Sequence, residues 1–352
     1  MTGCSGSSTA TVRPNKWQEI RLVSYPVGEP HDGNFALVEV EAPDLEVGEY
    51  LVSNEWISLD PAQRLRMNPN SAGYLPPFRL GEVPASWAVG RVVSSRNPSV
   101  AVGACVLHNS GWSECAVLNG CESRPPRLID RHPALRSVDF LGPLGWPGLT
   151  AYAGLFDVGR AQPGETVFVS AAAGAVGGMV VQLAKARGLR VVASVGTREK
   201  ADLVGREYGA DAVVCYRDGD IRELLPRVAG NGIDIYFDNV GGDHLEAALA
   251  SMRPYGRIVL CGSIASYNDS EAGRAPANLF LATAKGLILH GFLARMYEHR
   301  WDEFSDHMRT LVERGQMKAP MTVVEGLEAI PQGFRKLFSG GNVGKMVVRI
   351  GQ

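Results

Sequence analysis

The sequence predicts an α/β protein in which a doubly wound parallel sheet is joined to a second, β-rich domain. From about residue 138 onward, short apolar segments rich in β-branched residues alternate with segments of helical periodicity, which is the pattern of a parallel sheet with helical crossovers. Earlier in the chain, and again over 321–350, short strand-like runs are broken by Gly, Pro and Asn, as in a β-rich domain. The central domain is therefore expected to be inserted into a discontinuous one.

Six segments are predicted to be strands of the parallel sheet, because each is short, apolar and bounded by turn residues. They are 166–170, 190–195, 212–215, 233–238, 257–261 and 287–291. Helices are expected between most of them, including 175–187, 200–208, 221–228 and 243–252, with a further helix near 298–314. The predicted organisation is a flexible tail over 1–15, a β-rich domain over 16–137 and 307–352, and a nucleotide-binding domain over 138–306.

A glycine-rich turn follows the first of these strands. Ala171, Gly174 and Gly177 form an A-x-x-G-x-x-G arrangement that opens an amphipathic helix at Ala175 and Val176. Small residues let the backbone approach a pyrophosphate, and the helix N-terminus presents N–H groups and a positive dipole to it. Glycines also serve tight turns and close packing, but the order strand, turn, helix and strand indicates dinucleotide binding.

The end of the second strand indicates which dinucleotide is bound. An NAD site usually has Asp or Glu there to accept hydrogen bonds from the ribose. This chain instead has the hydroxyls of Ser194 and Thr197 with the cations Arg198 and Lys200, and no carboxylate before Glu199. Such a set suits the 2′-phosphate of NADPH. The alternative is that the two cations are solvated charges on the first turn of a surface helix.

Composition and cysteine spacing narrow the classes of function. Lys and Arg total 35 against 37 Asp and Glu, so no excess of positive charge points to nucleic acid or to an anionic membrane. The first fifteen residues lack an apolar run, no segment is long and apolar enough to span a bilayer, and a cytoplasmic protein is expected. The six cysteines include no C-x-x-C pair, so neither a zinc lobe nor a redox pair is supported. Cys215 and Cys261 are expected to be reduced core residues.

Several motifs, in order along nearly the whole chain past the tail, are similar to those of one family. They are Ser58-Leu59-Asp60-Pro61 with Arg64, Gly81-Glu82, Leu144 to Tyr152, Tyr236 to Gly242, Cys261 to Asn268 and Gly341 to Lys345. The chain resembles the zinc-independent medium-chain dehydrogenase/reductase family, in the group of NADPH-dependent 2-alkenal, prostaglandin and curcumin reductases. The resemblance implies a GroES-like substrate domain around a Rossmann domain, NADPH as the hydride donor, and usually a homodimer.

The resemblance also implies roles for individual residues. Those expected near the adenosine phosphate are Lys200, Tyr216 and Asn342, and those near the ribose and nicotinamide are Asn239, Cys261, Gly262 and Phe292. Tyr267 matches the tyrosine that lies beside the nicotinamide ribose and the substrate carbonyl. Tyr267 could instead merely pack a strand-end loop, and Asn239 could serve the turn before Gly241.

The substrate pocket is expected to be lined by aromatic residues and by Tyr267 itself. The candidates are Ala62, Tyr74, Trp87, Trp112, Trp146 and Tyr267. Two of these positions depart from the family pattern: Ala62 stands where many relatives have a tyrosine, and Trp146 where they have a methionine. A bulkier or differently oriented substrate is therefore plausible.

The implied activity is conjugate reduction of an α,β-unsaturated ketone or aldehyde, with Tyr267 stabilising the enolate before it is protonated. Three alternatives stay open: reductive cyclisation of a polyene, for which Ala62 makes room; a non-catalytic NADPH-binding protein; and an alcohol dehydrogenase. The last is disfavoured because the Gly81-Glu82 segment lacks the histidine of the zinc enzymes, so no metal site is expected. The expected partner is a small hydrophobic enone or polyene.

Overall fold

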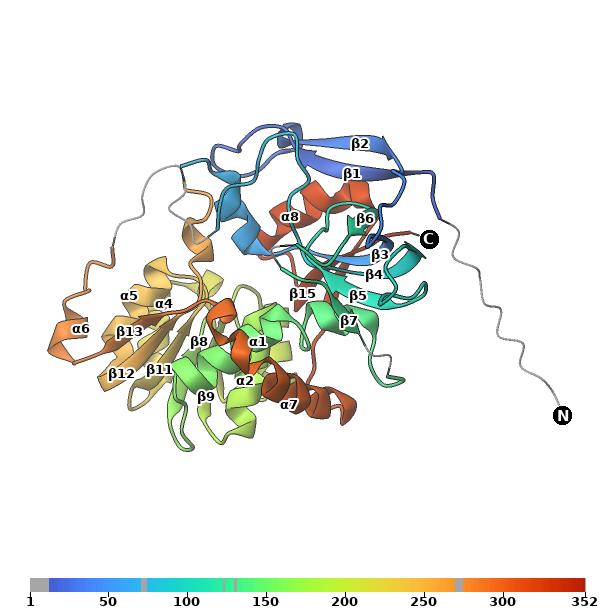
Figure 1. Ribbon diagram of the computed structural model, residues 1–352. Helices are drawn as coiled ribbons and strands as arrows, with labels where there is room; N and C mark the ends of the chain where they lie inside the picture. Colours follow the sequence, from blue (N-terminus) through green and yellow to red (C-terminus); the bar gives the residue numbers. More distant parts are fainter. Residues whose placement is uncertain (1–12, 71–74, 123, 130–131, 270–274, 352) are drawn as a thin grey trace.

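Six parallel strands form a doubly wound sheet in the described part of the chain (Figure 1). The computed structural model describes residues 13–70, 75–122, 124–129, 132–269 and 275–351. The strands are β8 (Thr166–Val169), β9 (Arg190–Val195), β10 (Ala212–Cys215), β11 (Ile233–Asp238), β12 (Met252–Leu260) and β13 (Ile288–Gly291), in the order β10-β9-β8-β11-β12-β13. All six predicted strands are present. Only β12 differs greatly, because it begins at Met252 and continues through Tyr255, whose φ is 63°.

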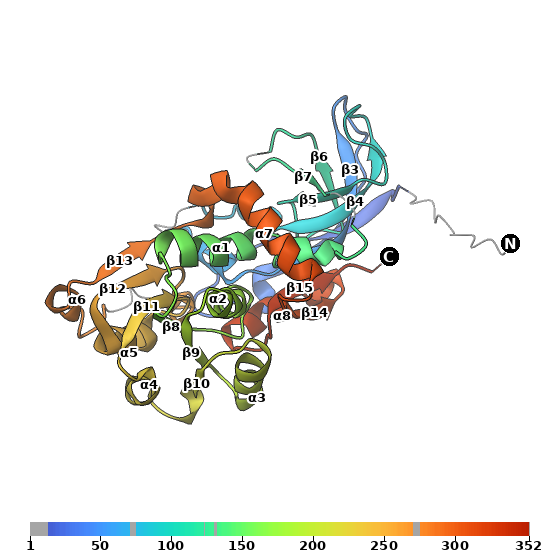
Figure 2. The same ribbon diagram turned by 90° about the horizontal axis from the view of Figure 1, so that it is seen from below.

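Helices cover both faces of this sheet, as the helical periodicity predicted. On one face lie α1 (Trp146–Ala153), α2 (Ala175–Ala186) and α7 (Trp301–Glu313); on the other lie α4 (Ile221–Ala229) and α5 (Gly242–Ser251). Figure 2 shows α7 beside α1, where the rings of Tyr152 and Phe304 meet. The short helices α3 (Arg198–Asp202) and α6 (Leu281–Ala284) complete this unit. No helix in the described ranges is long and apolar enough to cross a membrane.

The β-rich unit is built from both ends of the chain. Its seven-stranded sheet, counted over the described residues, contains β3 (Tyr50–Ser58), β4 (Ala88–Ser95), β5 (Cys105–His108), β6 (Cys115–Leu118), β7 (Arg127–Ile129), β14 (Met321–Glu325) and β15 (Lys345–Arg349). A two-stranded sheet, β1 (Lys16–Leu22) with β2 (Phe35–Glu41), and the helix α8 (Ile330–Phe338) pack beside it. The antiparallel pairing of β15 with β3 returns the C-terminal segment to the N-terminal unit.

The structure bears on the predicted domain limits at two places. The predicted boundary between 306 and 307 falls inside α7, whose Phe304 and Met308 are fully buried in the core under the parallel sheet. This helix packs with the nucleotide-binding unit because its apolar side chains face α1. Residues 1–12 of the predicted tail lie outside the described residues. The numerical limits of the domains stay a prediction.

The prediction that Trp112 lines the substrate pocket and the prediction that two cysteines lie in the core both need correction. Trp112 does not line a pocket: it is fully buried in the core of the β-rich unit, where its ring meets Phe35 and Phe334. A large apolar ring serves a core as well as a pocket, and its sequence context does not separate the two. Cys215 and Cys261 are free thiols but only half-buried, because each stands at or just past a strand end rather than in the middle of the sheet.

Candidate functional site

A cavity of about 920 Å³ lies between the two units, at the carboxyl ends of the parallel strands. Its lining includes residues just past β8, β9, β11, β12 and β13, together with residues of the β-rich unit such as Asp60, Ala62 and Trp87. The strand order reverses direction at β8, since β9 follows on one side and β11 on the other. A crevice at such a reversal is the usual place for a dinucleotide in an open α/β sheet.

The predicted glycine turn forms one wall of this cavity. Ala171 has a φ of 50°, and its carbonyl accepts a hydrogen bond from the Gly174 N–H at 2.9 Å. A Cβ on Gly177 would lie only 2.4 Å from the Ala171 carbonyl oxygen, so the turn requires a residue without a side chain there. Gly174 is the N-cap of α2 and supplies no side-chain cap. The first N–H groups of α2 are therefore suited to the pyrophosphate of a dinucleotide.

The predicted adenosine-phosphate residues Lys200, Tyr216 and Asn342 all line the cavity. Lys200 donates from Nζ to the Gly340 carbonyl at 2.7 Å. Burial, and then the neighbouring Arg217, lower the pKa of Lys200. Two neighbouring cations repel each other, and an anion bound beside them relieves that repulsion. This end of the cavity therefore fits the 2′-phosphate of NADPH.

A loop near the C-terminus completes this end of the cavity. The Gly344 N–H donates to the Ala173 carbonyl at 2.8 Å, and Gly344 forms a backbone bridge with Gly174 in the glycine turn. Gly344 has a φ of 64°, and a Cβ on it would lie 1.9 Å from the Pro320 carbonyl oxygen, so only glycine fits. The Asn342 side chain donates to the Gly344 carbonyl at 2.8 Å. The loop thus brings Asn342 into the lining of the cavity, and its Gly340 carbonyl accepts the hydrogen bond from Lys200.

Two predicted cofactor residues do not reach the cavity. Ser194 is fully buried, and its side-chain oxygen has no partner among the described residues. Thr197 caps α3, where its hydroxyl accepts a hydrogen bond from the Lys200 N–H at 3.3 Å. Neither residue is among those that line the cavity. Alternate side chains of a strand point to opposite faces of the sheet. The presence of a hydroxyl residue at a strand end therefore does not establish that its side chain points toward the cavity.

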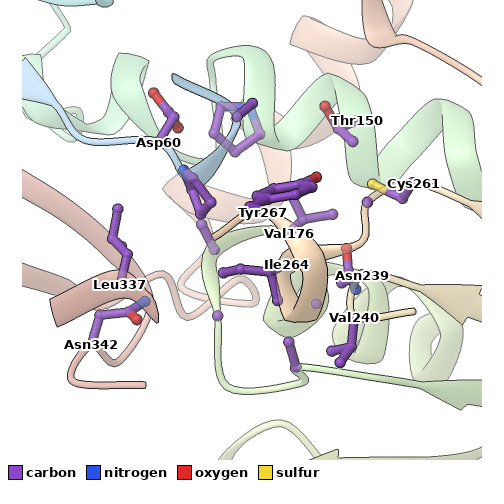
Figure 3. A pocket seen from close by; sticks show the side chains of 18 of the residues that line it. Asp60, Thr150, Val176, Asn239, Val240, Cys261, Ile264, Tyr267, Leu337 and Asn342 are labelled. Atoms are coloured by element: carbon purple, nitrogen blue, oxygen red, sulfur yellow. The ribbon is translucent and has the colours of Figure 1, made fainter. Parts of the chain in front are cut away.

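A buried carboxylate fixes the loop after β11. Asp238 accepts hydrogen bonds from the Tyr236 hydroxyl at 2.7 Å, the Val240 N–H at 3.0 Å and the Gly241 N–H at 2.8 Å. Burial raises the pKa of Asp238, and these donors offset part of that cost. The result is a rigid turn that presents Asn239 and Val240 to the cavity (Figure 3).

Asn239 joins the ends of two strands as well as lining the cavity. Its side-chain nitrogen donates to the Ser170 carbonyl at 2.8 Å, and its backbone N–H donates to the Ser170 hydroxyl at 2.9 Å. The residue therefore has a structural role at the reversal point, close to the turn role that the sequence left open. Asn239 thus lines the cavity where the end of β11 meets the end of β8.

Tyr267 lies across the cavity in Figure 3, with its hydroxyl on the side of Cys261 and Thr150. The hydroxyl oxygen accepts a hydrogen bond from the Ser263 N–H at 3.2 Å. A Cβ on Gly262 would lie 3.1 Å from that oxygen, so glycine lets the phenol approach the end of β12. Burial, and secondarily Asp238, raise the pKa of the Cys261 thiol to about 12. The neutral thiol and the phenol therefore face the same part of the cavity.

The predicted substrate side is an aromatic wall. Trp87 and Trp146 line the cavity and stack with their ring centroids 5.3 Å apart, and Trp146 also meets Trp301 at 5.4 Å. Ala62 lines the cavity with a methyl group only. Phe292 lines it too but is 6% exposed, because its ring packs against Phe237. The predicted pocket residue Tyr74 lies outside the described residues.

The sequence analysis assigned no role to an ion pair in the cavity lining, between a buried lysine and a partly exposed aspartate. Lys345 is 4% exposed, and its Nζ lies 3.0 Å from a carboxylate oxygen of Asp60. The ammonium also donates to the carbonyls of Leu59 and Met346, and the Ser58 hydroxyl donates to Asp60. Burial lowers the pKa of Lys345, and Asp60 opposes that effect. A lysine directly before the apolar run of residues 346–348 was the signal that could have indicated it.

Arg64 is a second candidate functional residue. The sequence analysis named it as part of a motif but assigned it no role. It is 4% exposed and donates to the Asn268 side chain at 3.1 Å and to the carbonyls of Pro26 and Gly28 at 3.2 and 2.8 Å. Asn268 directly follows Tyr267. Arg64 therefore ties the β-rich unit to the loop that carries the candidate catalytic phenol.

No group of three or more His, Cys, Asp or Glu side chains in the described ranges is placed to hold a metal ion. The donors of the cavity are instead hydroxyls, amides, backbone N–H groups and cationic side chains such as that of Lys200. This arrangement can bind a phosphorylated dinucleotide along the strand ends and place a flat, apolar substrate against the tryptophans.

Comparison with known proteins identifies the family. Residues 18–125 match the N-terminal domain of an oxidoreductase family, and residues 175–312 match the family described as zinc-binding dehydrogenase. The chain is 38% identical to the NADPH-dependent curcumin reductase of Escherichia coli (strain K12), over 94% of this chain and 95% of that protein. It is 35% identical to the NADP(+)-dependent 2-alkenal reductase of Nicotiana tabacum, over 95% of this chain and 97% of that protein.

A solved structure agrees with the predicted fold. CurA from Vibrio vulnificus, in complex with NADPH, superimposes with a TM-score of 0.90 and 35% identity, over 95% of this chain and 99% of that one. The predicted Rossmann sheet with a strand-rich GroES-like domain is confirmed. The chain therefore belongs to the medium-chain dehydrogenase/reductase family, in the group that includes NADP-dependent 2-alkenal and curcumin reductases.

Proposed function

We propose that this protein is an NADPH-dependent reductase of the carbon–carbon double bond of α,β-unsaturated ketones or aldehydes. The observation that supports it most is the position of Tyr267, whose hydroxyl lies at the end of β12 inside the cavity (Figure 3). Relatives named 2-alkenal reductase, curcumin reductase and (+)-pulegone reductase support the same reaction class.

The residues of the cavity fit NADPH at both ends. Lys200, Tyr216 and Asn342 hold the adenosine 2′-phosphate, and the N-terminus of α2 at Gly174 holds the pyrophosphate. Bound NADPH supplies the hydride. Asn239 and Cys261 border the space between the glycine turn and Tyr267, which is where the nicotinamide ring fits. The NADPH complex of CurA supports this cofactor.

Tyr267 acts on the carbonyl oxygen of the substrate. When the β-carbon of an enone is reduced, negative charge develops on that oxygen, and a positioned O–H donor stabilises it. The Tyr267 oxygen already accepts from the Ser263 N–H at 3.2 Å, which fixes the phenol in place at no cost during the reaction. The α-carbon of the enolate then takes a proton, from Tyr267 or from water.

The test is the substitution Tyr267→Phe, assayed by the absorbance of NADPH with a panel of enones. Turnover is expected to fall by roughly ten- to a thousandfold, the range for one lost oxyanion donor or acid. The KM for NADPH should change little, because the phenol contacts the substrate. The control is Tyr208→Phe, which removes a hydroxyl that is buried outside the cavity.

Three outcomes of that assay count against parts of the proposal. Unchanged turnover in Tyr267→Phe would remove the phenol from the mechanism. No NADPH oxidation with any enone would favour a non-catalytic NADPH-binding protein. A product whose NMR spectrum shows a new ring would replace simple reduction by reductive cyclisation.

We also propose that the protein forms a homodimer through β13, the outer strand of the parallel sheet. β13 is the last strand of the sheet in the described part of the chain, and an exposed edge is a template for pairing with another strand. Large apolar side chains are exposed beside it: Tyr255 at 81%, Phe280 at 76% and Ile288 at 55%. A second copy pairing antiparallel through the same edge would cover them.

The dimer is tested by light scattering of the wild type and of Leu289→Pro. Phe292 donates its N–H to the Leu260 carbonyl of β12, so the N–H of Leu289, which alternates with it, faces the open edge. Proline there removes a donor to a ladder across the edge, so the variant is expected to be monomeric. A wild type that is monomeric at micromolar concentration would exclude this interface.

A further inference from the structure

A third tryptophan lies behind the aromatic wall of the cavity. Trp146 lines the cavity, and the centroid of its ring is 5.4 Å from that of Trp301. Trp301 is the first residue of α7 and is not among the residues that line the cavity. Trp146 therefore separates the cavity from Trp301. The reaction proposed above gives Trp301 no part.

Trp146 contacts two other indoles, and they come from different units. Trp87, which directly precedes β4 in the β-rich unit, stacks with Trp146 at an interplanar angle of 26°. The Ser58 N–H donates to the Trp87 carbonyl at 2.7 Å, which fixes the backbone at Trp87. Trp301 meets Trp146 at an angle of 59°. Aromatic pairs in stacked and tilted arrangements attract each other beyond the area they bury, so a rotation of Trp146 would lose two such contacts.

Trp301 is itself held by both units. The fully buried Phe304 meets its ring edge-on, with the centroids 5.5 Å apart. The Arg127 guanidinium, from β7 of the β-rich unit, lies 4.2 Å from the Trp301 centroid and pairs with Glu298 at 2.7 Å. A guanidinium over the face of an indole is attracted by the electron density of the ring. Trp301 is therefore a fixed support for the ring of Trp146.

The residue type at position 146 makes this support important. In the family pattern the position is a methionine, whereas this chain has an indole. A methionine side chain is unbranched and adapts its shape to its neighbours. An indole is a rigid plate that moves only as a whole. It can therefore exclude a bulky group from the cavity only while something behind it prevents that movement.

We propose that Trp301 determines which acceptors this protein reduces, by holding Trp146 in place against the cavity. This inference rests on the proposed function, because the acceptor is the enone of that reaction. Trp301 is a positioning residue, since it contacts the cavity only through Trp146. With Trp301 in place, the ring of Trp146 limits the size of one substituent of the enone. An acceptor with a larger group there has to displace the ring and break its contacts.

The experiment measures kcat/KM with NADPH for benzylideneacetone and for two analogues enlarged by a tert-butyl group, one on the phenyl ring and one at the carbonyl carbon. The measured quantity is the ratio of each analogue to the parent compound. A single methylene in an apolar pocket changes kcat/KM by about 10- to 200-fold. Trp301→Leu leaves space behind Trp146 into which the ring can move. We expect the ratio for at least one analogue to rise by about tenfold or more.

A graded variant and two controls separate this effect from a general loss of stability. Trp301→Phe keeps a smaller ring beside Trp146 and should raise the same ratio by less. Trp17→Leu removes an indole that is 8% exposed in a separate core cluster and does not line the cavity, so its ratios should equal those of the wild type. In Trp146→Met the supported ring is gone, so adding Trp301→Leu should change the ratios little further. The KM for NADPH should stay that of the wild type throughout.

The outcomes distinguish a failure of this inference from a failure of the proposed function. If enones are reduced but both Trp301 variants keep the wild-type ratios, the reductase stands and Trp301 does not select the acceptor. The same holds if Trp301→Leu changes the ratios equally in the wild type and in Trp146→Met, or if Trp17→Leu changes them as much. If Trp301→Leu does not fold, Trp301→Phe decides alone. If the wild type oxidises NADPH with no enone, the proposed function fails and this inference falls with it.

Discussion

Arg64 and Asn268 join the β-rich unit to the loop of Tyr267, and breaking their hydrogen bond should slow the reaction without weakening cofactor binding. Neither side chain lines the cavity, so neither contacts NADPH or the substrate directly. Asn268→Ala removes the acceptor that Arg64 reaches at 3.1 Å and frees the residue next to Tyr267. A displacement of about 1 Å in a catalytic group can cost up to a hundredfold in rate. We therefore expect kcat to fall by about ten- to a hundredfold, with the KM for NADPH unchanged.

The effect on stability follows from the contacts of Arg64. Arg64 is 4% exposed and makes three hydrogen bonds, to the Asn268 side chain and to the carbonyls of Pro26 and Gly28. Each such bond from a charged donor contributes about 1.5–3 kcal/mol, but burying the cation costs several kcal/mol. Arg64→Ala should therefore lower the free energy of unfolding by about 2–5 kcal/mol, and Asn268→Ala by about 1.5–3 kcal/mol.

A double-mutant cycle measured by urea unfolding separates the shared bond from the rest. The two losses should not add, because the double variant loses the Arg64–Asn268 bond only once, and the coupling should be about 1–2 kcal/mol. Arg64→Lys is the control for charge: a lysine keeps the cation but cannot reach three acceptors in different directions. Additive losses, or an Asn268→Ala variant with wild-type kcat, would refute the reasoning.

Two further predictions concern the cofactor and the pH dependence of stability. Lys200→Ala should raise the KM for NADPH by about ten- to a hundredfold and leave that for NADH nearly unchanged, because one charge-assisted bond to the 2′-phosphate is lost. Arg206→Ala, which removes an exposed cation outside the cavity, is the control. Equal effects of Lys200→Ala on both cofactors would contradict the assignment. Burial, and then Glu207, raise the pKa of Tyr208 to about 12. Above about pH 10 the tyrosine of the unfolded chain loses its proton while that of the native state keeps it. The free energy of unfolding therefore falls as the pH rises through this range. Urea unfolding at about pH 9 and about pH 11 should show a smaller loss for Tyr208→Phe than for the wild type, and an equal loss would exclude this residue as a cause.

The local patterns of the sequence predicted most of the fold because each strand of the central sheet carries its own signal. The apolar segment of β8, the glycine turn and α2 follow one another in the chain, so their arrangement is settled by neighbours. The ion pair between Asp60 and Lys345 was not predicted because it joins residues at opposite ends of the chain. Its formation depends on the pairing of β15 with β3, which no local pattern specifies.

The residues of the site that lie next to a local motif could be predicted, and those brought together by long-range packing could not. Residues adjacent to a motif, such as Gly174, Gly177 and Tyr267, line the cavity as expected. The Ser194 side chain, by contrast, is fully buried and does not line the cavity. A shift of one residue along a strand moves a side chain to the opposite face of the sheet, and the sequence does not specify that position. Arg124 and Arg295 also line the cavity, but neither belongs to a sequence motif that could have indicated it.

The return of β15 to the sheet of the first unit has a consequence for how the protein is made. β15 lies between β14 and β3, and the loop before it supplies Asn342 to the phosphate end of the cavity. The parallel sheet is contiguous in the chain and can fold on the ribosome as it emerges. In the first unit, by contrast, the residues of β3 that pair with β15 stay unpaired until β15 has been synthesised. The cavity can therefore be completed only after β15 has been synthesised.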